Sequence, residues 1–152
     1  MPLKAAKLRA KKLDEISEIV PGLLAGGYLA ARDIGTLRRG GVTHLLSLRE
    51  ERPEENEGFE SLHLPMSDSG DSSLSEVATS AARFIDTARD AGGRVLVFCD
   101  LGVNRTAAVI AGYLILKGWT AEAAIERVSQ ARPVISIIEP YKLQLRALAG
   151  RE

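Results

Sequence analysis

Two apolar segments joined by a short polar turn restrict the fold of this chain more than any other feature. The first, Arg94 to Phe98, is almost wholly apolar, as in a strand covered on both faces of a sheet. The second, Thr106 to Lys117, is apolar nearly all round, which predicts a central, buried helix. A buried strand that leads directly into a buried helix is typical of α/β folds.

The remaining segments alternate between strand-like and helix-like patterns. Extended segments are predicted at 19–26, where Pro21-Gly22 divides the segment in two, at 42–48 and at 60–64. Helices are predicted at 31–39, from the capping-box sequence at 73–76 to Gly92, from Thr120 to about Gln130, and from Pro140 onward. This alternation predicts one α/β domain, a three-layer sandwich with a central, mostly parallel twisted sheet flanked by helices.

The charge balance excludes a general attraction to polyanions. The chain of 152 residues carries 20 Lys and Arg and 20 Asp and Glu, so its formal net charge is zero. We therefore expect no nucleic acid and no membrane among its partners. The longest apolar run, 107–116, is too short to span a bilayer. Any affinity for phosphate must come from a local site.

The N-terminal residues differ in character from the rest. Residues 1–17 form a basic flank, and residues 18–150 form the predicted domain. The flank lacks the apolar core of a secretory signal. It is either a short docking helix or a solvated tail, and the tail is the commoner outcome for such a charged segment.

The single cysteine excludes an internal disulfide, which suits a reducing compartment, so we expect a cytoplasmic protein.

The turn between the two apolar segments carries the clearest chemistry. In an open α/β sheet, ligands bind at the carboxyl ends of the strands. A helix N-terminus there offers free N–H groups and the positive end of a dipole, which together hold an anion. We therefore expect phosphate or another oxyanion to bind a loop of six residues, namely Asp100, Leu101, Gly102, Val103, Asn104 and Arg105.

Several side chains in and beside this turn have a chemical use. Cys99 lies in the positive field at the start of the helix, which favours a nucleophilic thiolate. Arg105 offers two phosphoryl oxygens a bidentate grip that a lysine cannot reproduce. The hydroxyl of Thr106 can stabilise a leaving thiolate. The alternative is an inert thiol buried at a strand end, but Gly102, Arg105 and Thr106 at these positions favour catalysis.

The general acid is less well defined by the residues. Hydrolysis of a phosphate ester needs an acid to protonate the leaving oxygen. His44 and His63 both lie within predicted strands. Asp68 and Asp71 follow the segment 60–64 in a loop, where either is also compatible with an ordinary loop aspartate. The residues alone do not separate these two carboxylates.

The turn resembles the signature loop of a known family. Cys99-x5-Arg105-Thr106 is similar to the loop of the protein tyrosine phosphatases, a superfamily of cysteine-dependent enzymes. Residues 18–149 resemble its dual-specificity branch, in the atypical small single-domain form, with further similarities at 19–26, 41–48, 64–68, 131–133 and 144–145. The resemblance implies a protein tyrosine phosphatase-like fold. It also implies hydrolysis of phosphotyrosine and phosphoserine/threonine in phosphoproteins, without metal or cofactor.

The same resemblance assigns the roles of individual residues. It implies Cys99 as the nucleophile that forms a phospho-cysteine intermediate, Arg105 as the phosphate clamp and Thr106 as the supporting hydroxyl. The spacing from the loop acid to the cysteine matches the family at Asp68 and not at Asp71. The resemblance therefore implies Asp68 as general acid and base.

Three positions depart from the pattern of that family. Phe98 stands where the family has a histidine, which predicts a slower nucleophile. Ile138 stands where an asparagine is expected to support the active-site loop. Asp100 adds a negative charge where an anionic substrate enters. These departures give an alternative hypothesis, a catalytically impaired, pseudophosphatase-like module that binds phosphoproteins or signalling partners.

Other phosphate-bearing substrates are less compatible with the turn. Asn104-Arg105-Thr106 also resembles RNA 5′-triphosphatases of the same superfamily. Such polyanionic substrates, like phosphoinositide lipids, favour basic surroundings, and the turn contains no lysine. A phosphoprotein is therefore the expected substrate.

Overall fold

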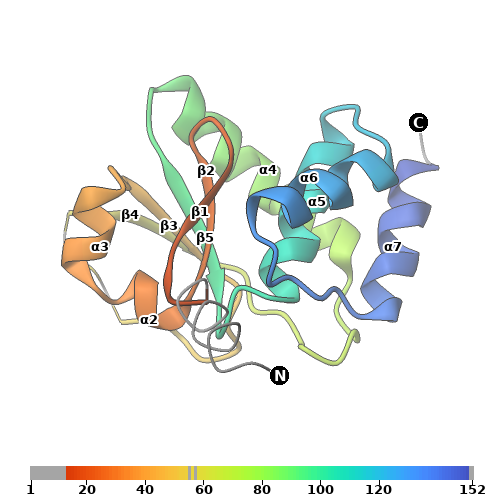
Figure 1. The fold of residues 1–152 in the computed structure, drawn as a ribbon, viewed down its shortest axis with the longest axis horizontal. Coiled ribbons are helices and arrows are strands. Elements are labelled where there is room, and N and C mark those ends of the chain that lie inside the picture. The colour runs from red at the N-terminus through yellow and green to blue at the C-terminus, as the bar shows by residue number, and fades with distance from the viewer. Residues whose placement is uncertain (1–12, 55, 57, 151–152) are drawn as a thin grey trace, which may run out of the picture.

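The computed structural model describes residues 13–54, 56 and 58–150, which form a sheet with helices on both faces (Figure 1). In sheet order the strands are β1 (Ser17–Val20), β2 (Leu23–Gly27), β5 (Val95–Cys99), β3 (His44–Ser47) and β4 (Glu60–His63). Only the β1–β2 pair is antiparallel within this described sheet. The predicted α/β fold with a mostly parallel sheet is confirmed.

The described helices form the two outer layers. They are α2 (Tyr28–Ala31), α3 (Ile34–Arg39), α4 (Leu74–Asp90), α5 (Arg105–Leu116), α6 (Ala121–Ala131) and α7 (Glu139–Ala149). In Figure 1, α2 and α3 lie to the left of the sheet, and α5, α6 and α7 lie to its right. Helix α5 contacts α4, α6, α7 and the strands β2 and β5, so it is the centre of the larger layer.

Strand β5 shows why both of these layers are needed. Its side chains alternate, so Val95, Val97 and Cys99 join the apolar cluster on the α5 side. Leu96 and Phe98 join a second apolar cluster on the α2–α3 side. All five residues of β5 are buried, as expected for a strand covered on both faces. The cysteine therefore faces α5.

Two of the predicted helix starts are confirmed by their caps. The Ser73 hydroxyl accepts a hydrogen bond from the amide of Glu76 (3.4 Å) at the start of α4. The Thr120 hydroxyl accepts one from the amide of Ala123 (3.1 Å) at the start of α6. Each hydroxyl satisfies an amide that has no partner within the helix itself.

The predicted helix at 31–39 is wrong in its first part. The structure has two short helices, α2 ending at Ala31 and α3 beginning at Ile34. Asp33 separates them, because its carboxylate accepts hydrogen bonds from the amide of Gly35 (3.1 Å) and the hydroxyl of Thr36 (3.0 Å). These bonds hold Asp33 in extended backbone as the cap of α3.

The predicted basic flank lies largely outside the described residues, since 1–12 are among those that the structure does not describe. Residues 13–17 are bonded to the domain. The guanidinium of Arg132 donates to the carbonyl of Glu15 (2.8 Å) and to the hydroxyl of Ser17 (3.0 Å). Within the described part of the chain, no helix is both long and apolar enough to cross a membrane.

Candidate functional site

The loop of residues 100–104 joins the carboxyl end of β5 to the start of α5. Gly102 has a φ of +70°, in the left-handed region that favours glycine. A Cβ at this position would lie 2.5 Å from the carbonyl oxygen of Gly26 and 2.8 Å from Nη2 of Arg132. The loop is thus packed directly against the end of β2, and a glycine is required there.

The backbone of this loop turns its carbonyl groups into the protein. Four successive carbonyls each accept a hydrogen bond: Asp100 O from Tyr28 N (3.0 Å), Leu101 O from Arg132 Nη2 (3.0 Å), Gly102 O from Arg132 Nε (2.8 Å) and Val103 O from Ser136 N (2.9 Å). Among the described residues, none of the amides of 100–104 donates a hydrogen bond. The loop therefore keeps its donors available, as a backbone anion site does.

Arg132 fixes the loop from beneath. It is 1% exposed and donates to two of the loop carbonyls. Burial lowers the pKa of Arg132, and electrostatic interactions with Cys99 and Glu15 act in the opposite direction. The sequence places Arg132 only within the family similarity at 131–133 and does not predict its bond to Gly102, which lies 30 positions away in the chain.

The predicted nucleophile and the predicted supporting hydroxyl lie side by side. Cys99 ends β5 and is 3% exposed. Thr106, in the first turn of α5, is fully buried, and its hydroxyl donates to Sγ of Cys99 at 3.0 Å. A hydroxyl in this position can stabilise negative charge on the sulfur.

Arg105 is the first residue of α5 and is 4% exposed. The protein does not use all of the N–H donors of its guanidinium. Its Nη1 donates to the carbonyl of Met66 (3.3 Å), and its Nη2 lies 3.2 Å from a carboxylate oxygen of Asp100. Its Nε lies 3.5 Å from Oδ1 of Asp68, but the geometry is not that of a hydrogen bond. Within the described residues, this Nε is the only buried side-chain nitrogen or oxygen without a hydrogen-bond partner.

Asp68 is brought to the same loop by Asn104. The Nδ2 of Asn104 donates to Oδ1 of Asp68 at 2.8 Å, and Oδ1 of Asn104 accepts from the amide of Ile138 at 3.0 Å. Asp71 instead accepts from the hydroxyl of Ser69 at 2.8 Å. The structure therefore places Asp68, and not Asp71, beside Arg105.

The contacts of Asn104 revise two expectations from the sequence. Its side chain binds Asp68 in the segment that joins β4 to α4 (the aspartate loop), whereas the sequence predicts only a phosphate-binding role for Asn104. Ile138 cannot support the loop with its side chain, but its backbone amide does so through Asn104. The aspartate loop is also held from α7, where the Tyr141 hydroxyl donates to the carbonyl of Ser67.

A cavity of about 190 Å³ opens above Arg105. It is lined by Arg49, Glu50, Glu51, Asp68, Asp100 and Arg105.

Nε of Arg49 donates to Oδ1 of Asp100 at 2.6 Å, and its guanidinium lies 3.7 Å from the ring centre of Tyr28. That hydrogen bond holds the pKa of Asp100 below its usual value, with burial acting against it and the charge of Arg105 adding to it. Asp100 is therefore ionised at neutral pH.

Phe98 lies on the other side of the sheet. It is 5% exposed and packs in the cluster that contains Leu37 and Leu45. Its carbonyl accepts a hydrogen bond from the amide of Leu48 at 2.9 Å. Its ring therefore serves as core, and the slower nucleophile expected from this substitution stays a prediction.

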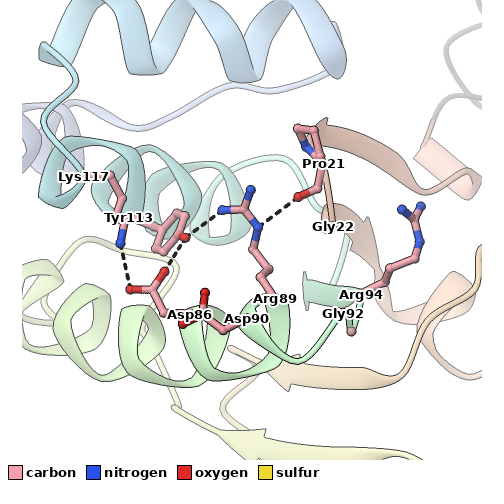
Figure 2. A pocket seen from close by; sticks show the side chains of 10 residues that line it. Pro21, Gly22, Asp86, Arg89, Asp90, Gly92, Arg94, Tyr113 and Lys117 are labelled. Carbon is pink, nitrogen blue, oxygen red and sulfur yellow. Dashed lines mark hydrogen bonds and ion pairs between the residues drawn. The ribbon is translucent and has the colours of Figure 1, made fainter.

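A larger cavity, about 550 Å³, lies at the opposite end of β5 (Figure 2). Figure 2 shows Arg89 between Pro21 and Tyr113, with Asp86 between Tyr113 and Lys117. The polar groups of these residues bond one another, so we interpret this cavity as a contact between structural elements and not as a ligand site.

The described residues also contain no cluster of three or more His, Cys, Asp or Glu able to hold a metal ion.

Comparisons with known proteins agree with the fold and with the family resemblance of the sequence. Residues 27–150 match the family model described as "Dual specificity phosphatase, catalytic domain". The chain is 31% identical over 141 residues to "Protein phosphatase Slingshot homolog" of Xenopus laevis, covering 91% of this chain and 20% of that protein. It is 33% identical over 134 residues to "Dual specificity protein phosphatase 1" of Arabidopsis thaliana, covering 87% of this chain and 68% of that protein.

The solved structures support the same assignment. The human tyrosine phosphatase-like serine/threonine/tyrosine-interacting protein superposes with a TM-score of 0.84 at 27% identity, covering 90% of this chain and 97% of that chain. The present chain spans about a fifth of the Slingshot relative. Since the family model matches most of its length, the chain belongs to the dual-specificity phosphatase catalytic-domain family.

Proposed function

We propose that this protein hydrolyses phosphate monoesters of phosphoproteins through a phospho-cysteine intermediate on Cys99. One observation carries the proposal. The amides of 100–104 and the buried Nε of Arg105 have no hydrogen-bond partner among the described residues, and all lie in or directly after the loop that follows Cys99. A buried donor such as Nε of Arg105 is normally paired, so its lack of a partner, together with the loop amides that donate to no protein group and the nearby nucleophile, is suited to an anion such as phosphate.

In the first step, the thiolate of Cys99 attacks phosphorus and the bond from phosphorus to the ester oxygen breaks. The loop amides and Arg105 stabilise the charge on the three non-bridging oxygens. Asp68, held by Asn104, donates its proton to the leaving oxygen. The phosphoryl group is then bonded to sulfur, and the dephosphorylated side chain departs.

In the second step, a water molecule attacks the phospho-cysteine and the phosphorus–sulfur bond breaks. Asp68, now ionised, takes a proton from that water. The hydroxyl of Thr106, which donates to Sγ of Cys99, stabilises the departing thiolate. Inorganic phosphate leaves, and Asp68 is protonated again for the next cycle.

The proposed substrates are phosphotyrosine and phosphoserine/threonine side chains. This breadth rests on membership of the dual-specificity family. Phe98, whose ring packs in the apolar core where the family resemblance implies a histidine, favours a second function, a phosphoprotein-binding module with little turnover, because it implies a slower nucleophile without removing the anion site. That second function corresponds to the pseudophosphatase alternative.

Hydrolysis of p-nitrophenyl phosphate against pH tests the proposal. We expect turnover by the parent, none by Cys99→Ser, and loss of the basic limb of the pH profile in Asp68→Asn. Asp71→Asn is the matched control and retains that limb. Phe98→His moves the acidic limb to lower pH if the aromatic residue slows the nucleophile. A parent no faster than Cys99→Ser contradicts catalysis and favours the binding module.

A further inference from the structure

The entrance to the cavity above Arg105 carries more negative than positive charge. Four carboxylates line it (Glu50, Glu51, Asp68 and Asp100), against the two guanidinium groups of Arg49 and Arg105. A phosphate ester is itself an anion, so an acidic entrance is unexpected for a site that must attract one. We propose that the substrate is a phosphoprotein segment with basic side chains next to the phosphorylated residue, an inference that rests on the proposed function.

The charge excess persists when the groups used in catalysis are set aside. Arg105 is committed to the phosphate and Asp68 to proton transfer. Arg49 then remains against Glu50, Glu51 and Asp100. The entrance therefore carries one positive and three negative charges, and it stays acidic when Arg105 holds the phosphate of the substrate. The whole chain has a formal net charge of zero, so this excess is a local property.

The carboxylates of the entrance are accessible to a partner. The side chain of Glu51 is 81% exposed and that of Asp100 is 60% exposed. Arg49 is 16% exposed, lies against the ring of Tyr28 and bonds Asp100. Nη2 of Arg49 also lies 3.7 Å from Oε2 of Glu51, so the one guanidinium of the entrance is largely buried and shared between two carboxylates, whereas those carboxylates stay mostly exposed.

Substrate binding would make the excess larger. Nη2 of Arg105 lies 3.2 Å from Oδ2 of Asp100. A phosphate that takes this donor displaces the carboxylate, which then keeps only its bond to Arg49. A Lys or Arg of the substrate beside the phosphorylated residue can replace the lost partner. An acidic segment instead meets like charges, which opposes binding.

Binding of three matched phosphotyrosine peptides to Cys99→Ser tests the inference without requiring turnover. The peptides differ only in the residues on both sides of the phosphotyrosine, which are Arg, Ala or Glu. Exposed ion pairs contribute little individually, so we expect the Arg peptide to bind about 3-fold to about 10-fold tighter than the Ala peptide. The Glu peptide binds most weakly. Raising the salt from about 0.1 M to about 1 M shortens the Debye length from about 10 Å to about 3 Å and reduces the preference.

A pair of charge-matched variants locates the preference. Glu50→Gln with Glu51→Gln removes two negative charges from the entrance. Glu122→Gln with Glu126→Gln removes the same charge from α6, where both residues line a different cavity. We expect the first double variant to lose most of the preference for Arg over Glu, and the second to retain it.

The outcomes separate this inference from the proposed function. Equal affinity for the Arg and Ala peptides, tighter binding of the Glu peptide, or no binding of any peptide each overturns the inference. Loss of the preference in the α6 control variant also overturns it. If the parent fails to hydrolyse p-nitrophenyl phosphate while the ranking Arg, Ala, Glu holds in binding, the inference stands and the catalytic proposal fails.

Discussion

Two arginines at opposite ends of strand β5 differ in how completely the protein occupies their donors. Arg89, near the amino end, donates from Nε to the carbonyl of Pro21 (2.9 Å) and from Nη1 to the hydroxyl of Tyr113 (2.8 Å). Arg105, at the carboxyl end, has a buried Nε with no hydrogen-bond partner in the described structure. The first lies in the larger cavity and the second in the smaller one.

The network around Arg89 is closed by further contacts (Figure 2). The Tyr113 hydroxyl donates to Oδ1 of Asp86 at 2.6 Å, and Lys117 donates to Oδ2 of Asp86 at 2.9 Å. These bonds join α4 to α5 and to the β1–β2 turn. A satisfied network stabilises a fold, whereas unsatisfied buried donors cost stability unless a ligand pairs with them. The state of the donors, and not the size of the cavity, therefore distinguishes the proposed active site.

Exchanging each arginine for lysine is the strongest test of this difference. We expect Arg105→Lys to lower kcat/KM for p-nitrophenyl phosphate by about 10³-fold, because lysine lacks the planar set of donors for two phosphoryl oxygens. Thermal unfolding of this variant should change little. The measurements are steady-state kinetics and a melting curve on the same preparation.

Arg89→Lys is the matched control for that exchange. It loses the bonds to Pro21 and Tyr113, so we expect the free energy of unfolding to fall by about 1–2 kcal/mol. Its kcat/KM should stay near the parent value. If the two variants have the same kinetic effect, the distinction between a structural and a ligand-binding arginine is wrong.

The bond from Asn104 to Asp68 gives a smaller expected effect. Asn104→Ala removes the donor that holds the carboxylate at 2.8 Å, and a misplaced general acid costs about 10-fold to about 100-fold in rate. The loss should be larger for a phosphoserine peptide than for p-nitrophenyl phosphate, whose better leaving group depends less on the general acid. Ser69→Ala, which breaks the bond to Asp71, is the control in the same loop. Equal losses on both substrates would show that Asn104 supports the loop and not the acid.

The smallest expected effect concerns Asp86 in the closed network. Burial raises the pKa of Asp86, but hydrogen bonds from Tyr113 and Lys117 outweigh it and hold that pKa below its usual value. A lowered folded-state pKa gives stability that is present above the unfolded pKa, about 3.9, and is lost as the pH falls through the folded value.

At pH 7 the free energy of unfolding of Asp86→Asn should therefore be lower than that of the parent by at most about 1 kcal/mol, because solvent screens the contacts of this carboxylate, whose side chain is 36% exposed. The difference should fade below about pH 4. Chemical denaturation across this pH range measures it. Asp90→Asn, in the same cavity, is the control because its carboxylate lies outside the hydrogen-bond network of the described residues. A difference that grows on acidification would contradict the assigned direction of the pKa shift.

Much of the fold, and the central motif of the site, follow from local pattern. The run from Arg94 to Phe98 and the apolar helix after it correspond to β5 and α5 because burial on both faces requires apolar residues at nearly every position. Ser73 and Thr120 cap helices as predicted, since a cap depends on residues within one turn. The helix predicted at 31–39 is confirmed from Ile34 to Arg39, but its predicted start is wrong because Asp33 caps α3 in extended backbone.

The sequence by itself determined that Cys99 and Arg105 stand at the two ends of one loop between a buried strand and a buried helix. Only the tertiary structure decided which distant groups complete that loop. Asn104 bonds Asp68 across 36 positions of the chain, Arg132 bonds Gly102 across 30, and Arg49 bonds Asp100 across 51. These contacts depend on how the helical layers pack against the sheet. Periodicity and local motifs do not predict that packing, because they report only on residues close together in the chain.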